Sequence, residues 1–211
     1  MSADKTRVQN QDDESALKEM KFRGKVWNPP KCLIQCPIHR IQKGVLYFLG
    51  RIVLHQKKGT EEIVKIATIC PDMQFKDCGS GKLKSVYEYA SAKLDNFKYK
   101  GFVSDLTLFS LMSRASVCVS MLWGENFGMA VVEAMAHGLP TIVYTVMAMR
   151  ENATCVIHDA EQASVLLREL KEIYSQSPEA WLQRKHEIQR NTFARFSDEA
   201  VILKIREMPI T

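Results

Sequence analysis

Two acidic residues between positions 123 and 140 stand at a spacing that suits binding of ligand hydroxyls. The stretch is WGENFGMAVVEAMAHGLP, with Glu125 ahead of Gly128 and Glu133 eight residues after the first acid. The pattern predicts a loop that feeds a helix N-terminus, where free N–H groups near residues 127–129 point at an anion or a hydroxyl-rich ligand. Each carboxylate can accept charge-assisted hydrogen bonds from a pair of hydroxyls. The apolar neighbours of Glu133 leave little room for a solvated helix face, which favours a ligand role.

Cationic residues form a second candidate group. Gly50-Arg51 follows the apolar run 45–49, and Lys57-Lys58-Gly59 precedes a predicted helix at 60–70. An arginine that ends a strand or a lysine pair in a loop is by itself typical of a solvated surface. Because both lie between one strand and the next helix start, their joint spacing indicates an anion site.

The glycine turn Gly79-Ser80-Gly81-Lys82 resembles a phosphate loop only superficially. Leu83 stands where Ser or Thr would hold magnesium, and Lys76 replaces the first glycine. The turn also fails as a dinucleotide fingerprint, because Lys84 occupies the place of the third glycine. We therefore predict a tight strand-to-helix turn.

The elements that must position these residues alternate between short apolar runs and helical patterns. This alternation predicts an α/β fold with a doubly wound parallel sheet of right-handed β-α-β units. In the last third, Asp159 and Gln162 fit a capping box for a helix that turns Leu167 and Ile173 inward. The expected strands are 45–49, 73–78, 97–100, 115–121, 141–144 and 154–157, and the expected helices include 60–70, 82–93 and 128–137.

Composition excludes several protein classes. The chain has 211 residues, 46% hydrophobic and 25% charged, with a net charge of +5. These values suit one globular domain, predicted at 25–211 after a polar tail at 1–24, and they argue against a nucleic-acid-binding stripe. The sequence has no apolar stretch long enough to predict a membrane-spanning segment or a secretory signal. The six cysteines lack C-x2-C spacing, which predicts reduced thiols in a cytoplasmic protein. The sequence contains no pattern that predicts a metal site.

Several motifs together resemble one enzyme family. Glu125-x7-Glu133 looks like the E-x7-E signature of retaining glycosyltransferases with the GT-B architecture, family four (glycosyl transferases group 1). The resemblance spans about residues 43–208 and is closest to enzymes that build lipid-linked oligosaccharides from GDP-mannose. The other matching motifs, in order, are Gly50-Arg51, Lys58-Gly59, Phe75–Gly81, Lys100–Val103 and Arg195–Ser197.

The resemblance implies a role for each candidate. Arg51 and Lys58 would neutralise the donor diphosphate, which is the leaving group, and Glu125 would hold hydroxyls of the transferred sugar. Glu133 would bind the ribose diol. It implies a nucleoside-diphosphate sugar (GDP- or UDP-sugar) as substrate, no divalent metal and no separate cofactor. The donor-binding segment would comprise Glu125, Asn126, Phe127, Gly128 and Met129.

The sequence departs from the family in two ways. Met147-Ala148 stands at the usual Gly-Gly pair ahead of Glu151. Glycine there permits close backbone approach, so a methionine would narrow the sugar or acceptor side of the cleft. The chain also matches only the C-terminal, donor-binding half of such an enzyme, so we expect the acceptor-binding half from a partner subunit or a longer chain.

Two alternatives to a transferase half remain. The first is a non-catalytic interaction module derived from a glycosyltransferase half, which the residues at 147–148 motivate. The second is nucleic-acid binding by the lysines between Lys76 and Lys100, which we disfavour because they fall on separate predicted elements without an aromatic stacking run. Association with a membrane would be peripheral, through a partner or a lipid-linked acceptor.

Overall fold

The computed structural model of the protein describes residues 5–7, 25–27, 38, 47–53, 59–121, 128–144, 153–197 and 200. Its centre is a six-stranded sheet in the order β5-β4-β3-β6-β7-β8, and every neighbouring pair is parallel. Counted from β3, this is the doubly wound order 3-2-1-4-5-6, as the alternation in the sequence predicts. The strands are β3 (Tyr47–Val53), β4 (Gln74–Ser80), β5 (Phe97–Tyr99), β6 (Val117–Ser120), β7 (Thr141–Tyr144) and β8 (Cys155–Ile157).

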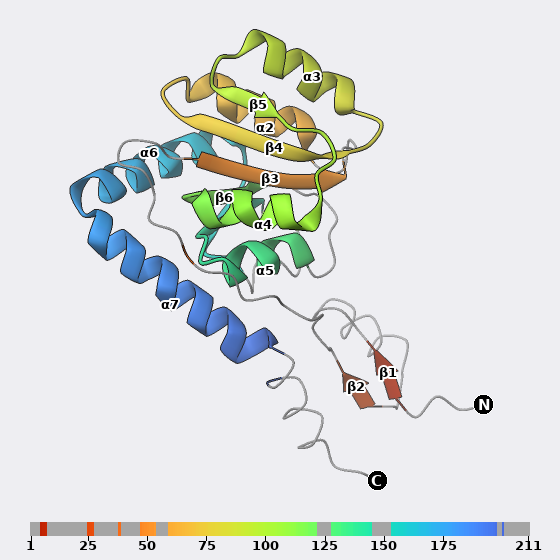
Figure 1. Cartoon of the computed structure of the whole chain (residues 1–211), viewed down its shortest axis with the longest axis vertical. Helices are drawn as coiled ribbons and strands as arrows, with labels where there is room; N and C mark the ends of the chain where they lie inside the picture. The colour runs from red at the N-terminus through yellow and green to blue at the C-terminus, as the bar shows by residue number, and fades with distance from the viewer. Residues whose placement is uncertain are drawn as a thin grey trace.

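Helices connect these strands and cover both faces of the sheet. Figure 1 shows α4 and α5 in front of the sheet and α2 behind it. The helices are α2 (Thr60–Ile69), α3 (Lys84–Lys93), α4 (Asp105–Arg114), α5 (Met129–Ala136), α6 (Ala160–Gln176) and α7 (Pro178–Phe196). Two further strands, β1 (Lys5–Arg7) and β2 (Lys25–Trp27), pair in parallel. The remainder of the predicted tail at 1–24 lies outside the described residues.

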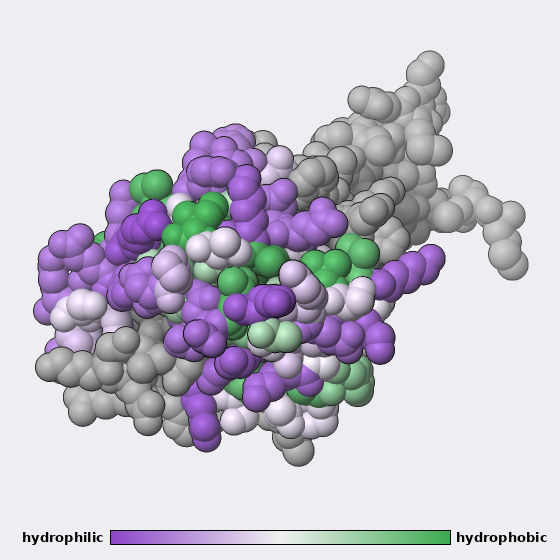
Figure 2. All heavy atoms as spheres, turned by 90° about the horizontal axis from the view of Figure 1, so that it is seen from above, coloured by the Kyte–Doolittle hydropathy of each residue, from purple (hydrophilic) through white to green (hydrophobic). Residues whose placement is uncertain are grey.

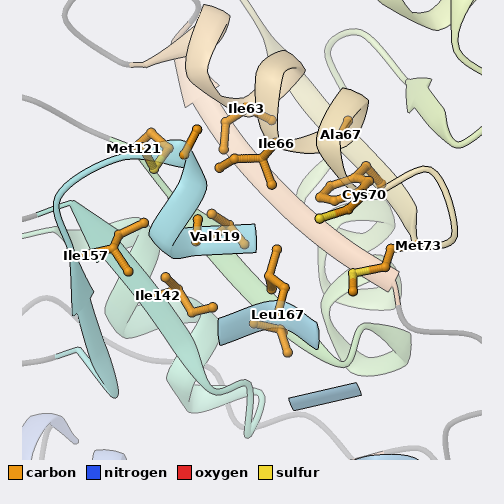
Figure 3. Close-up of a cluster of buried hydrophobic side chains, with 14 of the residues drawn as sticks. Ile63, Ile66, Ala67, Cys70, Met73, Val119, Met121, Ile142, Ile157 and Leu167 are labelled. Atoms are coloured by element: carbon orange, nitrogen blue, oxygen red, sulfur yellow. The ribbon is translucent and has the colours of Figure 1, made fainter. Parts of the chain in front are cut away.

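The larger apolar core lies between the sheet and the helices α2, α3 and α6. Figure 3 shows Ile63 and Ile66 of α2 facing Val119 of β6, with Leu167 of α6 completing the layer. The predicted inner face of α2 is confirmed, because Ile63, Ile66, Ala67 and Cys70 are all buried. A second cluster on the other face joins Leu108 and Met112 of α4 to the sheet.

The capping box at the start of α6 is confirmed. The Gln162 amide donates to the Asp159 carboxylate over 2.7 Å, and the Gln162 side chain accepts from the His158 amide over 2.9 Å. The inward placement of Ile173 is wrong, because this side chain is 52% exposed while Tyr174 is 3% exposed. Buried positions on a helix recur every three or four residues. In the last turn of α6 this spacing places Tyr174, and not Ile173, on the buried face.

A buried lysine connects α7 to the sheet. Lys185 has no exposed surface, and its Nζ donates to the backbone carbonyl of Ala115, just before β6, over 2.9 Å. Burial lowers the pKa of Lys185 to about 8, because desolvation penalises the charged ammonium.

This lysine should give protein stability a pH dependence in the alkaline range. The unfolded chain binds the proton more tightly between the lowered value near 8 and the ordinary 10.5, so the free energy of unfolding should rise with pH in that window. We expect Lys185→Met to remove this rise, which amounts to about 3 kcal/mol. Urea denaturation at several pH values measures it, with Lys82→Met, at an exposed lysine, as control. An unchanged pH profile in Lys185→Met would contradict the expectation.

Candidate functional site

The sheet has one topological switch point, between β3 and β6. From β3 the chain continues to β4 on one side, and from β6 it continues to β7 on the other. The connections therefore diverge and open a crevice at the carboxyl ends of the two strands, where doubly wound sheets bind ligands. β3 ends at Val53 and β6 ends at Ser120, and the helices that follow them begin after Gly59 and Gly128.

Gly59 brings the two segments into contact. It precedes α2 in the left-handed conformation, with φ of +67°. A Cβ built on Gly59 would overlap the carbonyl oxygen and Cβ of Met121, the residue that follows β6. Figure 3 likewise shows Met121 beside Ile63 in the first turn of α2. The start of α2 is thus packed directly on the end of β6, which no sequence motif revealed.

The first turn of α2 presents polar groups at the crevice. The helix has no side-chain N-cap, and its ladder begins with the Ile63 amide donating to the Gly59 carbonyl over 3.1 Å. Thr60 is 1% exposed, and among the described residues its hydroxyl has no hydrogen-bond partner. A helix N-terminus favours an anion, because its leading N–H groups carry partial positive charge.

The start of α5 repeats this arrangement on the other side of the switch point. Gly128 is left-handed with φ of +72° and gives no side-chain cap, and its carbonyl accepts from the amides of Val131 and Val132. The N–H groups of Met129 and Ala130 therefore precede the helix ladder. Glu133, one turn further on, is half-buried, as its apolar neighbours predict.

His137 holds the turn that carries Glu133, a feature that the sequence analysis missed. Its Nδ1 lies 2.8 Å from the backbone carbonyl of Glu133, and since a carbonyl only accepts, Nδ1 carries the proton. The ring stacks on Phe109 of α4 with centroids 5.2 Å apart. Burial lowers the pKa of His137, which keeps the ring neutral. Glu133 and His137 are four residues apart in the sequence, and this spacing was the signal that could have revealed the contact.

A buried carboxyl in β4 was also missed. Asp77 is 1% exposed, and neither of its oxygens has a hydrogen-bond partner among the described residues. Burial raises the pKa of Asp77 well above its usual range, and the nearby Tyr87 hydroxyl opposes this only in part. Asp77 pairs in register with Gly50, three residues before the end of β4, so it lies inside the sheet rather than at its edge.

The predicted site residues divide into two groups. Gly50 and Arg51 lie near the end of β3, and their backbones pair with Asp77 and Cys78 of β4. Gly128, Met129 and Glu133 lie at the start of α5. Lys58 directly precedes Gly59, and Glu125 follows Met121 by four residues. The remaining predicted residues lie outside the described part of the chain: Lys58, Glu125, Asn126, Phe127, Met147, Ala148 and Glu151.

The glycine motif at the end of β4 leads into a turn before α3, as expected. Gly79 and Gly81 have φ of 147° and 153°, and the Tyr99 hydroxyl donates to the Gly79 carbonyl over 2.7 Å. Among the described residues, no cluster of His, Cys, Asp or Glu side chains is arranged to hold a metal ion.

Comparison with protein families identifies the family to which this chain belongs. The sequence model described as glycosyl transferases group 1 matches residues 43–176, which is more than half of the chain. This protein belongs to the glycosyl transferases group 1 family. The match spans the elements from β3 to α6, so it includes both helix starts at the switch point and Glu133.

Curated relatives of this glycosyltransferase-family chain are mannosyltransferases by name. It is 32% identical over 108 residues to the phosphatidyl-myo-inositol mannosyltransferase of Mycolicibacterium smegmatis, covering 49% of this chain and 28% of the relative. It is 30% identical over 127 residues to the enzyme of the same name from Mycobacterium leprae, covering 58% and 32% respectively. The matched region is thus about a third or less of each relative's length.

Solved structures confirm the fold. Sucrose-phosphate synthase from Thermosynechococcus elongatus has a TM-score of 0.76 at 18% identity, over 98% of this chain and 57% of that one. The pneumococcal O-GlcNAc transferase GtfA, in complex with UDP and GlcNAc, has a TM-score of 0.74 at 15% identity, over 97% and 44%. The chain therefore has the Rossmann-like fold of GT-B glycosyltransferases and corresponds to about one half of such structures.

Proposed function

We propose that this chain is the donor-binding half of a retaining glycosyltransferase. It binds a nucleoside-diphosphate sugar in the crevice between β3 and β6, and it transfers a hexose such as mannose. The observation that carries the proposal is the contact of Gly59 with Met121, since it joins the segments that carry the predicted cations and acids at the switch point. An acceptor-binding half, as a partner subunit or another domain, supplies the second wall of the cleft.

The donor diphosphate is assigned to the end of β3 and the start of α2. Arg51 and Lys58 neutralise the negative charge that grows on the leaving group as the glycosidic bond breaks. The leading N–H groups of α2 support the same charge. Gly59 permits the close approach of the backbone that this packing requires.

The nucleoside and the sugar are assigned to the start of α5. Glu133 accepts hydrogen bonds from the ribose diol, and Glu125 accepts hydrogen bonds from hydroxyls of the transferred sugar. The amides of Phe127, Gly128 and Met129 donate to the sugar or the phosphate. His137 acts on this site indirectly, because it fixes the turn from which Glu133 projects.

The transfer proceeds on the front face of an oxocarbenium-like centre, without a protein nucleophile. A diphosphate oxygen accepts the proton of the attacking hydroxyl while the bond to the leaving group breaks. Positioning and charge stabilisation then supply the rate, and no divalent metal takes part. Met147 and Ala148, in place of two glycines, narrow the cleft and select the sugar or the acceptor.

The acceptor is assigned to the lipid-linked class, because the matched relatives are named for a phosphatidyl-myo-inositol acceptor. Within the described residues no helix is long and apolar enough to cross a membrane. Such an acceptor places the protein in the cytoplasm at a membrane surface, either directly or through its partner.

Removing Glu133 should weaken nucleotide binding. We expect Glu133→Ala to raise the dissociation constant for the matching nucleoside diphosphate by about 10- to 150-fold, since a charge-assisted hydrogen bond contributes about 1.5–3 kcal/mol. Isothermal titration calorimetry of the full chain with GDP, UDP and ADP measures the effect. Glu169→Ala removes an exposed acid on α6 and serves as the control. The proposal fails if none of the three nucleotides binds at millimolar concentration.

A non-catalytic interaction module is the competing function, and the residues at 147–148 are the observation in its favour. It predicts a stable complex with a partner that transfers no sugar from any donor. One structural neighbour is a GtfA/B complex, so pairing of two chains occurs in proteins of this fold. Transfer assays on the assembled complex, with and without Glu133→Ala, separate the two functions.

A further inference from the structure

One flank of the sheet carries a group of cationic side chains away from the crevice. Figure 1 shows α4 in front of β6, whereas β4 and β5 face the viewer without a helix over them. On this side of β4, Cys78 packs under Leu108 and Met112 of α4, but the residues nearer the sheet edge extend beyond that helix. On this part of the sheet Lys98 is exposed and Lys76 is half-buried.

Strand register places the lysines on this flank. β4 and β5 pair as Phe75 with Phe97, Lys76 with Lys98, and Asp77 with Tyr99. Residues in register share a face and the faces alternate along a strand. Both phenylalanines lie in the core beneath α2 and α3, and Asp77 and Tyr99 point the same way, toward Tyr87 of α3. The two lysines consequently lie side by side on the opposite face, with the carboxyl of Asp77 turned away.

Two more cations complete this group, which we call the basic face: Lys76, Lys98, Lys100 and Arg114. Lys100 follows β5, and its amide donates to the Asp77 carbonyl over 2.8 Å, which holds it against β4. Arg114 ends α4. Lys98, Lys100 and Arg114 are exposed, and Lys76 is half-buried. Partial burial lowers the pKa of Lys76, and the positive charges of Lys100 and Arg114 lower it further, so the cations stand close together.

We propose that the basic face docks this domain onto an anionic lipid surface. The four cations come from two neighbouring strands, the segment after β5 and the end of α4, so they form a cluster that can face a plane of lipid head groups. Lys100 is followed two residues later by Phe102, which is 82% exposed, and the segment from β5 to α4 runs on the same side of the sheet (Figure 1). An exposed aromatic next to lysines combines shallow insertion with attraction to negative head groups.

The surroundings of the basic face fit this assignment. Figure 2 shows an adjoining side of the molecule, seen from above, where the surface is mostly hydrophilic and apolar side chains form small patches. Lysine on an edge strand also prevents edge-to-edge pairing of sheets. That role needs lysines along the edge strand β5 alone, whereas this cluster includes Lys76 of the inner strand β4 and Arg114 of a helix.

The choice of a lipid rests on the proposed function, because a transferase acting on a lipid-linked acceptor must work at a membrane. The basic face lies on the flank of the sheet and not at the switch point, so docking leaves the crevice open. The two sites can therefore be tested separately.

The test is sedimentation of the full chain with vesicles. Vesicles of phosphatidylcholine with about 30 mol% phosphatidylglycerol are compared with vesicles of phosphatidylcholine alone. We expect binding only to the anionic vesicles, and release when salt is raised from about 0.1 M to about 1 M. Lys98→Glu/Lys100→Glu should lower the partition coefficient tenfold or more, because each basic residue near the surface contributes about fivefold. Lys84→Glu/Lys93→Glu, the same charge change on α3, should stay within about twofold of the wild type.

Three outcomes would overturn the proposal. The first is equal binding of the wild type to both kinds of vesicle, and the second is equal loss in both double variants. The third is unchanged vesicle binding in Lys98→Glu/Lys100→Glu with loss of binding to a single-stranded oligonucleotide, which would assign the basic face to nucleic acid. Glu133→Ala keeps vesicle binding and Lys98→Glu/Lys100→Glu keeps nucleotide binding, so failure of the docking proposal is distinct from failure of the proposed donor site.

Discussion

Replacing Gly59 by alanine should destabilise the protein by about 2–5 kcal/mol. The φ of +67° disfavours any side chain, and a Cβ would overlap the backbone carbonyl of Met121, which cannot move aside without shifting the end of β6. The crevice is formed at this contact, so nucleotide affinity should fall together with stability. Urea denaturation measures the first effect and calorimetric titration with the matching nucleoside diphosphate measures the second.

Gly101→Ala is the matched control for this substitution. Gly101 has the same φ of +67°, but a Cβ there would meet nothing within 4 Å. Gly101→Ala should therefore lower the free energy of unfolding only by the backbone strain of an alanine in the left-handed conformation, about 1–2 kcal/mol. If both substitutions cost the same, the contact of Gly59 with Met121 does not hold the two segments together, and the observation that carries the proposed donor site is lost.

Replacing Asp77 by asparagine should stabilise the protein at neutral pH. Burial raises the pKa of the Asp77 carboxyl well above 3.8, so between that value and the folded pKa the folded state keeps a proton that the unfolded chain has lost. Folding must therefore take up a proton, and each pH unit above 3.8 costs about 1.4 kcal/mol until the folded pKa is reached. Asparagine has the same shape and no such cost, so Asp77→Asn should raise the free energy of unfolding at pH 7 by that accumulated cost.

The sign of the pH dependence identifies the cause. A raised folded pKa means that the folded state binds more protons than the unfolded chain above pH 3.8, so the stabilising contribution of protonated Asp77 declines as pH rises. The decline should disappear in Asp77→Asn. Asp72→Asn is the control, since Asp72 is exposed, its pKa is lowered by a hydrogen bond to Lys171, and its removal should change stability by less than about 0.5 kcal/mol. Destabilisation of Asp77→Asn at pH 7 would show that Asp77 is ionised and paired.

The strands and helices were predictable from the sequence because each depends on local periodicity and capping. Strand 141–144 has its predicted limits, and Ser104 caps α4 by accepting from the Thr107 amide over 3.3 Å. The partial burial of Glu133 also followed from its apolar neighbours. Ile173 shows the limit of such reasoning, because a small error in helical phase accumulates over four turns.

The motifs of the sequence by themselves determined the family, the parallel sheet and the order of the candidate segments. Only the tertiary structure decided that Gly59 packs on Met121, that His137 anchors Glu133, and that Lys76 lies beside Lys98 with Asp77 facing the other way. Each of these is a contact or a register between segments, which depends on how strands pair and on which face each side chain occupies. The types of neighbouring residues and their spacing determine the local backbone conformation. Contacts between residues distant in the sequence depend on the packing and register of the whole sheet.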